Sequence, residues 1–245
     1  QLKPDLNVCV LEKAASAGAH MLSGAVIEPG PLDELLPEWR NELKGICVPA
    51  GDDEFSFFTR TKRYKLPTPP QMGNHGNYII SLGNLARWLG EQAEALGVEI
   101  YPGFAAAEVL YHEDGSVKGV ATGDMGSGRN GQHKDSYAQG MELHAKYTLF
   151  AEGCRGSLSQ QLMSKFNLRD GVDPQVYGLG VKELWQVPKE NHQPGLVVHS
   201  QGWPLPNDVG GGSFLYHFGD GLISVGFVTH LSYANPHLSP FEEMQ

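Results

Sequence analysis

The segment Asn7–Lys13, NVCVLEK, limits the possible folds more than any other part of this sequence. Its continuous apolar run, Val8–Leu11, is typical of a parallel strand buried on both faces, and Glu12 follows where that strand ends. In dinucleotide-binding units, an acidic residue at this place accepts hydrogen bonds from ribose hydroxyls. It lies about 20 residues after a Gly-rich turn. Only eleven residues precede Glu12, and none is glycine. The pattern therefore indicates either a nucleotide-binding sheet whose Gly-rich turn lies outside this sequence or an ordinary glutamate at an exposed strand end.

Composition excludes several classes of protein. A hydrophobic content of 40% and a charged content of 19% over 245 residues are those of a folded globular chain. The formal net charge of −10 argues against nucleic-acid binding, which needs a basic surface. The three cysteines, Cys9, Cys47 and Cys154, are too few and too far apart for a disulfide framework or a sulfur-ligated metal site. No apolar run reaches the roughly 18 residues of a membrane-spanning helix.

The first two thirds of the chain carry a mixed α/β pattern. Leucines recur at helical spacing from Leu82 to Gly97, with Ser81 placed to cap the start of a helix and Gly97 to end it. Three short strands are predicted next, in VEIYPG, AAAEVLYH and VKGVAT, and the last two form a hairpin. The polar stretch GDMGSGRNGQHKD then reads as a surface loop.

A second strand–turn–helix pattern follows, and beyond it the sequence pattern becomes strand-like. HAKYTLFAEG indicates a buried strand that runs into a Gly-flanked turn, and SLSQQLMSKF a helix with Ser157 and Gln160 in capping-box spacing. Beyond residue 173 come the strand-like runs VYGLGVKELWQV, GLVVHS, GSFLYHF and LISVGFVTH. We therefore expect an α/β fold with a domain over residues 1–172 and a β-rich domain over 173–245.

Two turns near predicted strand ends are candidate ligand sites. AEGCRG, residues 151–156, joins a strand to a helix, and its backbone N–H groups would suit an anion or a ribose, although a plain capped turn is a strong alternative. GAHMLSG, residues 18–24, contains glycines and small side chains that would let a flat ring lie against its backbone. His20 within it is either a ligand contact or, more often for a single histidine, a structural residue.

Two aromatic segments are candidates for contact with lipid or with an apolar ligand. FSFFTRTKRYKLPTPPQM, residues 55–72, alternates phenylalanines with basic residues, as in a hairpin resting on a membrane surface or a half-buried hairpin with a solvated basic face. GGGSFLYHF, residues 210–218, places three glycines before an aromatic strand, which exposes backbone to a flat ligand or simply marks a bulged strand entry.

Together these segments resemble the electron transfer flavoprotein–ubiquinone oxidoreductase family. The resemblance rests on VCVLEKAASAGAHMLSGAVIEP, on the long stretch from NHGNYIISL to VKGVAT, and on ELHAKYTLFAEGCRGSLSQQL, YGLGVKELW and GGSFLYHF, in order and with matching spacing. It implies a Rossmann-like FAD-binding domain, incomplete here, followed by part of a ubiquinone-binding domain. It also implies that this chain is an internal part of a longer protein, whose Gly-rich turn precedes it and whose four-cysteine [4Fe–4S] region follows it.

The resemblance assigns roles to single residues. FAD would be held by Glu12 at the ribose and by backbone of Ala105 or Ala106 at the adenine. The flavin would be lined by Gly18, His20, Ser23 and Gly24, with Ala151 and Gly153 closing the site. A quinone carbonyl would be held by backbone at Gly211 and Gly212, and Phe57 and Phe58 would belong to the membrane surface. No metal ligand is expected within this chain.

The activity implied is electron transfer from reduced electron transfer flavoprotein, through FAD, to ubiquinone, on a protein attached to the surface of the bacterial cytoplasmic or mitochondrial inner membrane. Neither a nucleophile nor a general base is expected. Two alternatives stay open: a geranylgeranyl-reductase-like or nitrogen-fixation-associated flavoprotein, which would share the FAD segments but lack the aromatic hairpin and the GGSFLYH segment, and an inactive piece with membrane- or protein-binding ability alone.

Overall fold

The computed structural model describes residues 6–22 and 25–245, and these residues form two compact units. One unit contains residues 1–20 and 87–174, and the other contains residues 21–86 and 175–245. This division differs from the expected domains, 1–172 and 173–245, because residues 21–86 carry strands that complete the sheet of the C-terminal region. Ser23 and Gly24, which are predicted to line the flavin, lie outside the described residues.

In the first unit, β1 (Cys9–Glu12) pairs in parallel with β7 (Glu99–Pro102). β8 (Ala106–Tyr111), β9 (Val117–Thr122) and β12 (Glu142–His144) form an antiparallel sheet in the order β12-β9-β8. Leu158 and Leu162 of α4 (Ser157–Lys165) pack on Val109 and Val120 of this sheet and form the core of the unit. The predicted strand at VEIYPG and the predicted hairpin of VKGVAT with AAAEVLYH are therefore confirmed.

The helix predicted over residues 82–97 is α3 (Leu82–Ala95), and its ends have the predicted chemistry. Ser81 Oγ accepts the N–H of Asn84 at 3.3 Å, which satisfies one donor of the first turn. At the other end Gly97, with φ +91°, donates to Glu94, and Val98 donates to Ala93. This pair of bonds is a Schellman motif, which needs a residue that tolerates positive φ.

Two predictions for the first unit are wrong. The stretch GDMGSGRNGQHKD is not a plain loop, because β10 (Met125–Ser127) and β11 (His133–Ala138) pair there as an antiparallel hairpin. The strand predicted in HAKYTLFAEG is limited to His144 at the end of β12, and residues 145–156 contain no strand. The N–H of Ala145 still donates to Lys118 of β9 at 3.1 Å, but no described strand pairs with the residues after it, and Tyr147 and Leu149 are 87% and 88% exposed.

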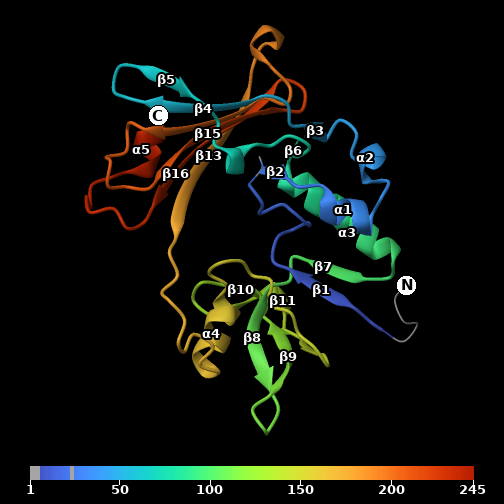
Figure 1. The fold of residues 1–245 in the computed structure, drawn as a ribbon. Coiled ribbons are helices and arrows are strands. Elements are labelled where there is room, and N and C mark those ends of the chain that lie inside the picture. The colour runs from blue at the N-terminus through green and yellow to red at the C-terminus, as the bar shows by residue number, and fades with distance from the viewer. Residues whose placement is uncertain (1–5, 23–24) are drawn as a thin grey trace. The chain divides into compact units, whose positions relative to one another are not determined.

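The second unit is built on a six-stranded sheet with the order β13-β16-β15-β14-β4-β5 (Figure 1). The four runs predicted beyond residue 173 are strands of this sheet, which confirms those predictions. The strands of this sheet are β4 (Asp53–Phe58), β5 (Arg63–Leu66), β13 (Gly178–Gln186), β14 (Val197–Gly202), β15 (Gly211–Phe218) and β16 (Leu222–His230). All neighbours are antiparallel except β14 and β4, which run parallel.

A smaller sheet and short helices complete the second unit. β2 (Ala25–Ile27), β6 (Tyr78–Ile80) and β3 (Cys47–Pro49) form a sheet in the order β2-β6-β3. Ile79 of β6 is fully buried against Val197 and Phe218 of the large sheet. The remaining helices are α1 (Gly30–Leu35), α2 (Trp39–Glu42), α5 (Pro240–Met244) and the 3-10 turns η1 (Pro70–Met72) and η2 (Lys189–Asn191). Among the described residues, no helix is long and apolar enough to cross a membrane.

Candidate functional site

In the first unit, the carboxyl end of β1 brings Glu12 next to the predicted adenine segment. The N–H of Phe104 donates to the carbonyl of Glu12 at 3.1 Å, and Ala105 and Ala106 follow directly as the chain enters β8. The N–H of Ala14 donates to Glu12 Oε1 at 2.6 Å and fixes the carboxylate at the strand end. Glu12 Oε2 has no hydrogen-bond partner in the described part of the chain and remains available to a ligand hydroxyl.

The AEGCRG turn does not form the anion site that its pattern suggested. The N–H groups of Leu158 and Ser159, at the start of α4, donate to the side chain of Glu152 at 3.3 and 2.7 Å. Ser159 Oγ also donates to Glu152. Burial alone would raise the pKa of this carboxyl, but the hydrogen bonds from Ser159 and Leu158 together outweigh it and lower the pKa. The capping box predicted from Ser157 and Gln160 is therefore wrong, since Glu152 performs the capping and Gly156 is the N-cap residue.

The other predicted flavin contacts of the first unit take no part in capping α4. Gly153 has φ +78° in an exposed turn with Ala151, and no described hydrogen bond connects that turn with Glu12. Gly18 is buried and has φ +77°, whereas His20 is exposed. The structure thus brings together Glu12, Ala105 and Ala106. It does not bring Ala151 and Gly153 into a strand of the same sheet, as the spacing had suggested.

In the second unit, Gly211 and Gly212 enter β15 where neighbouring backbone comes very close. A Cβ on Gly212 would lie 2.1 Å from the carbonyl oxygen of Ser200, and one on Gly211 would lie 2.2 Å from that of Val228. Both positions thus exclude any side chain, and Gly211 also has φ +148°. Close strand packing is a sufficient reason for the two glycines, and it leaves their backbone uncovered on the side that faces a cavity.

This cavity, which we call the glycine cavity, has a volume of about 250 Å³ and is lined by Gly211, Gly212, Phe55, His199 and Tyr216 among others. Tyr216 Oη and His199 Nε2 lie 2.9 Å apart, on neighbouring strands. Phe214 stacks on Tyr216 with ring centroids 4.8 Å apart. A flat apolar ligand with a hydrogen-bonding atom at its edge suits these walls.

Burial controls the charge of the polar pair in the glycine cavity. It lowers the pKa of His199, although the carboxylate of Asp53 opposes this shift, and it raises the pKa of Tyr216 to about 12. Both groups are therefore neutral near pH 7. When Nε2–H of His199 donates to Tyr216 Oη, the phenolic hydrogen is left to donate to an acceptor in the cavity.

Sequence reasoning missed His199 and Tyr216 as site residues. Their signal was present, because GLVVHS and GSFLYHF are both strand patterns that contain polar aromatic residues, one in the first and two in the second. The register of β14 against β15 was not readable, and this register places His199 opposite Phe214 and one diagonal step from Tyr216.

The hairpin of β4 and β5 confirms the predicted hairpin near residues 55–72, and it separates the two phenylalanines expected at a membrane. Phe57 pairs with Tyr64 on one face of the sheet, where their exposed fractions are 37% and 49%. Phe58 points to the opposite face, since side chains alternate along a strand, and it is half-buried. Trp203, also missed by sequence reasoning, is exposed beside this hairpin, and its backbone N–H donates to the carbonyl of Phe58 at 2.9 Å.

The basic residues of the hairpin fall into two groups. Arg63 and Lys65 donate to Glu54 at 2.6 and 2.7 Å, and Lys65 is the main reason that the pKa of Glu54 is lowered. Arg60 and Lys62 lie in the turn and are exposed, with no ion pair among the residues that the structure describes. The turn therefore presents two uncompensated positive charges beside exposed aromatic rings.

No metal centre is formed within the described ranges. There, no group of three or more histidine, cysteine, aspartate or glutamate side chains is placed to hold a metal ion. Cys9, Cys47 and Cys154 are all free thiols.

Comparison with solved structures concerns the fold. The chain is similar to a geranylgeranyl bacteriochlorophyll reductase-like protein from Thermoplasma acidophilum, with a TM-score of 0.60 and 15% identity over 98% of this chain and 54% of that one. It is also similar to a flavoprotein/dehydrogenase from Cytophaga hutchinsonii, with a TM-score of 0.56 and 17% identity over 98% and 54% of the two chains. At these identities the likeness concerns the fold alone, which is mixed α/β.

Sequence comparison is more specific. Residues 177–245 match the family described as ETF-QO, ubiquinone-binding. The chain is 53% identical to the mitochondrial electron transfer flavoprotein-ubiquinone oxidoreductase of Bos taurus, over 100% of this chain and 40% of that protein. It is also 53% identical to the probable electron transfer flavoprotein-ubiquinone oxidoreductase of Acinetobacter baylyi, over 99% and 43% of the two. The resemblance predicted from the sequence is confirmed, and the chain spans about two fifths of the length of these relatives.

The lowered pKa of His199 predicts a pH-dependent stability. Below the ordinary histidine pKa of about 6.5, the unfolded chain binds a proton that the folded chain resists, so stability falls as the pH falls toward the folded-state pKa. We expect the melting temperature to drop less between about pH 7.5 and 5.5 in His199→Gln than in the native protein. The exposed His112→Gln is the control. Equal drops in His199→Gln and the native protein would contradict the burial of a neutral imidazole.

Proposed function

We propose that this chain is part of a flavoprotein that passes electrons from reduced electron transfer flavoprotein, through FAD, to ubiquinone at a membrane surface. The observation that carries the proposal is the combination of 53% identity to such oxidoreductases over the whole chain with a cavity at Gly211 and Gly212 inside the segment that matches the ubiquinone-binding family. The geranylgeranyl-reductase-like alternative is supported only by fold likeness at 15% identity.

The carboxyl end of β1 suits the ribose of FAD. Glu12 keeps one carboxylate oxygen without a described partner, and Ala105 and Ala106 lie beside it in the chain entering β8. We propose that Glu12 accepts a ribose hydroxyl and that this backbone meets the adenine. Gly18, His20, Ser23, Gly24, Ala151 and Gly153 stay proposed flavin contacts on the resemblance alone. FAD would supply the redox chemistry, taking electrons from the partner flavoprotein and releasing them to quinone.

The glycine cavity suits a quinone headgroup. The uncovered backbone of Gly211 and Gly212 would hold one carbonyl, and Phe214 and Tyr216 would lie against the ring. The neutral His199–Tyr216 pair would offer a hydrogen to an oxygen of the bound ring without placing a charge beside it. The [4Fe–4S] cluster of the proposed full-length protein would be held by residues outside this chain, since the described residues provide no such ligand set.

The β4–β5 hairpin is the proposed membrane contact. Phe57 and Tyr64 present exposed rings, and Arg60 and Lys62 carry the positive charge that anionic lipid attracts, at about 1 kcal/mol for each basic residue. The proposed location is the surface of the bacterial cytoplasmic or mitochondrial inner membrane, and nucleic acid is not a proposed partner.

The visible absorption spectrum of the full-length gene product tests the proposed function. We expect flavin and iron–sulfur bands that bleach on anaerobic reduction and return when a ubiquinone analogue is added. Flavin bands without an iron–sulfur contribution would favour the reductase-like alternative. A matching titration of the isolated 245-residue chain with FAD would identify an inactive piece, because such a piece would bind no flavin.

Glu12→Gln tests the ribose contact. A hydrogen bond to a charged group contributes about 1.5–3 kcal/mol, so we expect FAD to bind at least about tenfold more weakly in the full-length protein. The exposed Glu108→Gln, in β8 of the same unit, is the matched control. Fluorescence titration of the apoprotein with FAD gives both dissociation constants, and an unchanged value for Glu12→Gln would remove Glu12 from the site.

Replacing Phe57 and Phe58 by serine tests the membrane contact. Each ring taken fully out of water contributes about 1.5–3 kcal/mol, so sedimentation with anionic liposomes should weaken while FAD stays bound. Phe57→Ser alone should account for most of the effect, because Phe58 is on the other face of the sheet. Leu168→Ser, at a position that is 60% exposed outside the hairpin, is the control. Unchanged sedimentation of the double variant would contradict the proposal.

A further inference from the structure

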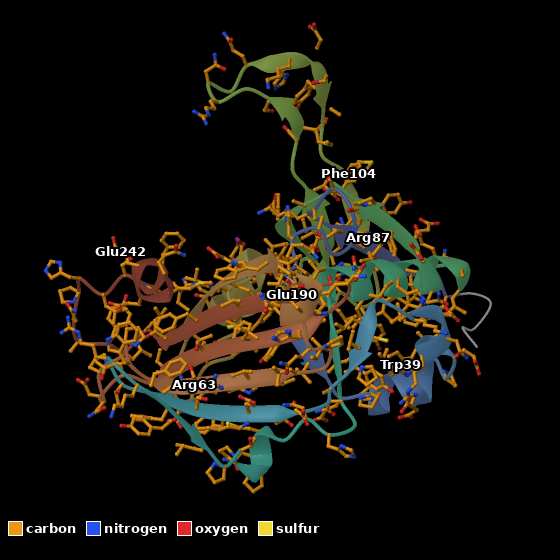
Figure 2. All side chains as sticks on the ribbon, turned by 90° about the horizontal axis from the view of Figure 1, so that it is seen from above. Trp39, Arg63, Arg87, Phe104, Glu190 and Glu242 are labelled. Carbon is orange, nitrogen blue, oxygen red and sulfur yellow. The ribbon has the colours of Figure 1, made fainter. Side chains whose placement is uncertain are left out.

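A second cavity of about 410 Å³ opens on the large sheet of the second unit, and we call it the Ser–His cavity after Ser200, Ser213 and His217 in its lining. Apolar side chains of Leu196, Val198, Leu215 and Val225 form much of the rest of its wall. Glu54, Phe58 and Arg63 also line it, on the side of the β4–β5 edge. Figure 2 shows Arg63 at this edge of the sheet.

The Ser–His cavity and the glycine cavity lie on opposite faces of the sheet. Ser213, Leu215 and His217 alternate along β15 with Gly212, Phe214 and Tyr216, and alternate side chains of a strand point to opposite faces. Ser200 and Val198, which pair with Ser213 and Leu215, share the face of the Ser–His cavity. Ser200, Ser213 and Phe214 line both cavities, so only the thickness of the sheet at these residues separates a ligand in one cavity from a ligand in the other.

His217 is the deepest polar group of the Ser–His cavity, with an exposed fraction of 5%. Its Nδ1 accepts the N–H of Gln193 at 3.0 Å, so a neutral ring must carry its hydrogen on Nε2. Burial lowers the pKa of His217, and the neighbouring His192 lowers it further, which keeps the ring neutral. Within the part of the chain that the structure describes, Nε2–H has no hydrogen-bond partner, and it is not a fully buried atom, so it remains accessible to a ligand in the cavity.

The other polar groups of the cavity also have hydrogens to offer. Ser200 Oγ and Ser213 Oγ are hydrogen-bonded to each other, so one of the two hydroxyl hydrogens stays free. Arg63 uses Nε for Ser56 and Nη2 for Glu54, which leaves Nη1. The carboxylate of Glu54 already accepts from Arg63 and Lys65. The cavity therefore combines apolar walls with several unused donors. Its side-chain acceptors, apart from the serine oxygens, are the carboxylate of Glu54, which is already paired, and the amide oxygen of the exposed Gln193.

We propose that the Ser–His cavity is a second ligand site, for an uncharged ring whose polar atoms are all acceptors, the chemistry of an oxidised quinone headgroup. A quinol, which carries two hydroxyl donors, fits this donor-rich lining less well. A fatty carboxylate is also disfavoured, because the deepest donor is neutral and Glu54 offsets the basic rim. The identification of the ligand as a quinone rests on the proposed function, whereas the acceptor-only chemistry comes from the cavity itself.

Binding stoichiometry of a decyl-tailed ubiquinone analogue to the full-length protein tests this proposal. We expect two molecules per protein. His217→Phe keeps the ring but removes the donor, and it should weaken one of the two sites about tenfold, whereas His217→Gln keeps an N–H donor and should retain both. Glu190→Gln, exposed in η2 and outside both cavities, is the control. Dodecanoate should displace neither molecule.

Each other result overturns the inference. A single bound quinone that is insensitive to His217→Phe, in a protein that quinone still reoxidises, leaves the proposed function standing and removes the second site. Displacement of the second molecule by dodecanoate reassigns the cavity to a carboxylate. If His217→Phe and His217→Gln weaken quinone binding at the second site equally, His217 acts through packing alone. A protein that quinone neither binds nor reoxidises contradicts the proposed function as well.

Discussion

The parallel pairing of β14 with β4 is the interaction on which the second unit depends. It joins Asp53–Phe58 to Val197–Gly202, segments about 140 residues apart in the chain, and so extends a four-stranded antiparallel sheet by a hairpin. Without this pairing the aromatic and basic hairpin would have no support, since an isolated two-stranded hairpin is marginally stable in water. The pairing also places Glu54, Phe55 and Phe58 at the walls of the two cavities.

The period of two along a strand then distributes the chemistry of this sheet. One face carries Gly212, Tyr216 and His199, and the other carries Ser213, His217 and Ser200. On both faces a few polar side chains lie among apolar ones, and burial keeps both histidines neutral. A sheet of this kind provides hydrogen-bond donors for uncharged acceptors, which agrees with electron transfer to a quinone and with the lack of a nucleophile or general base in the proposed chemistry.

The first unit shows where sequence patterns were reliable and where they were not. The ends of α3 and the β8–β9 hairpin follow from local chemistry, because Ser81, Gly97 and the turn at residues 112–116 determine backbone geometry within a few residues. The predicted strand in HAKYTLFAEG failed because a strand also needs a partner, and β9 provides one only as far as Ala145. The N-terminus of α4 was misjudged for a similar reason, since a pattern does not say that Glu152 will turn back and occupy it.

The sequence by itself determined the family resemblance, the order of most elements and the positions of Glu12 and of the glycine pair. These properties depend on short segments whose residue types limit their own backbone, as at Gly97 or in the apolar run before Glu12. Only the tertiary structure decided that β4 and β5 join the C-terminal sheet, that Phe57 and Phe58 lie on opposite faces, and that His199 meets Tyr216. The physical reason is register: which strands pair, and at which residue, depends on contacts between segments far apart in the chain.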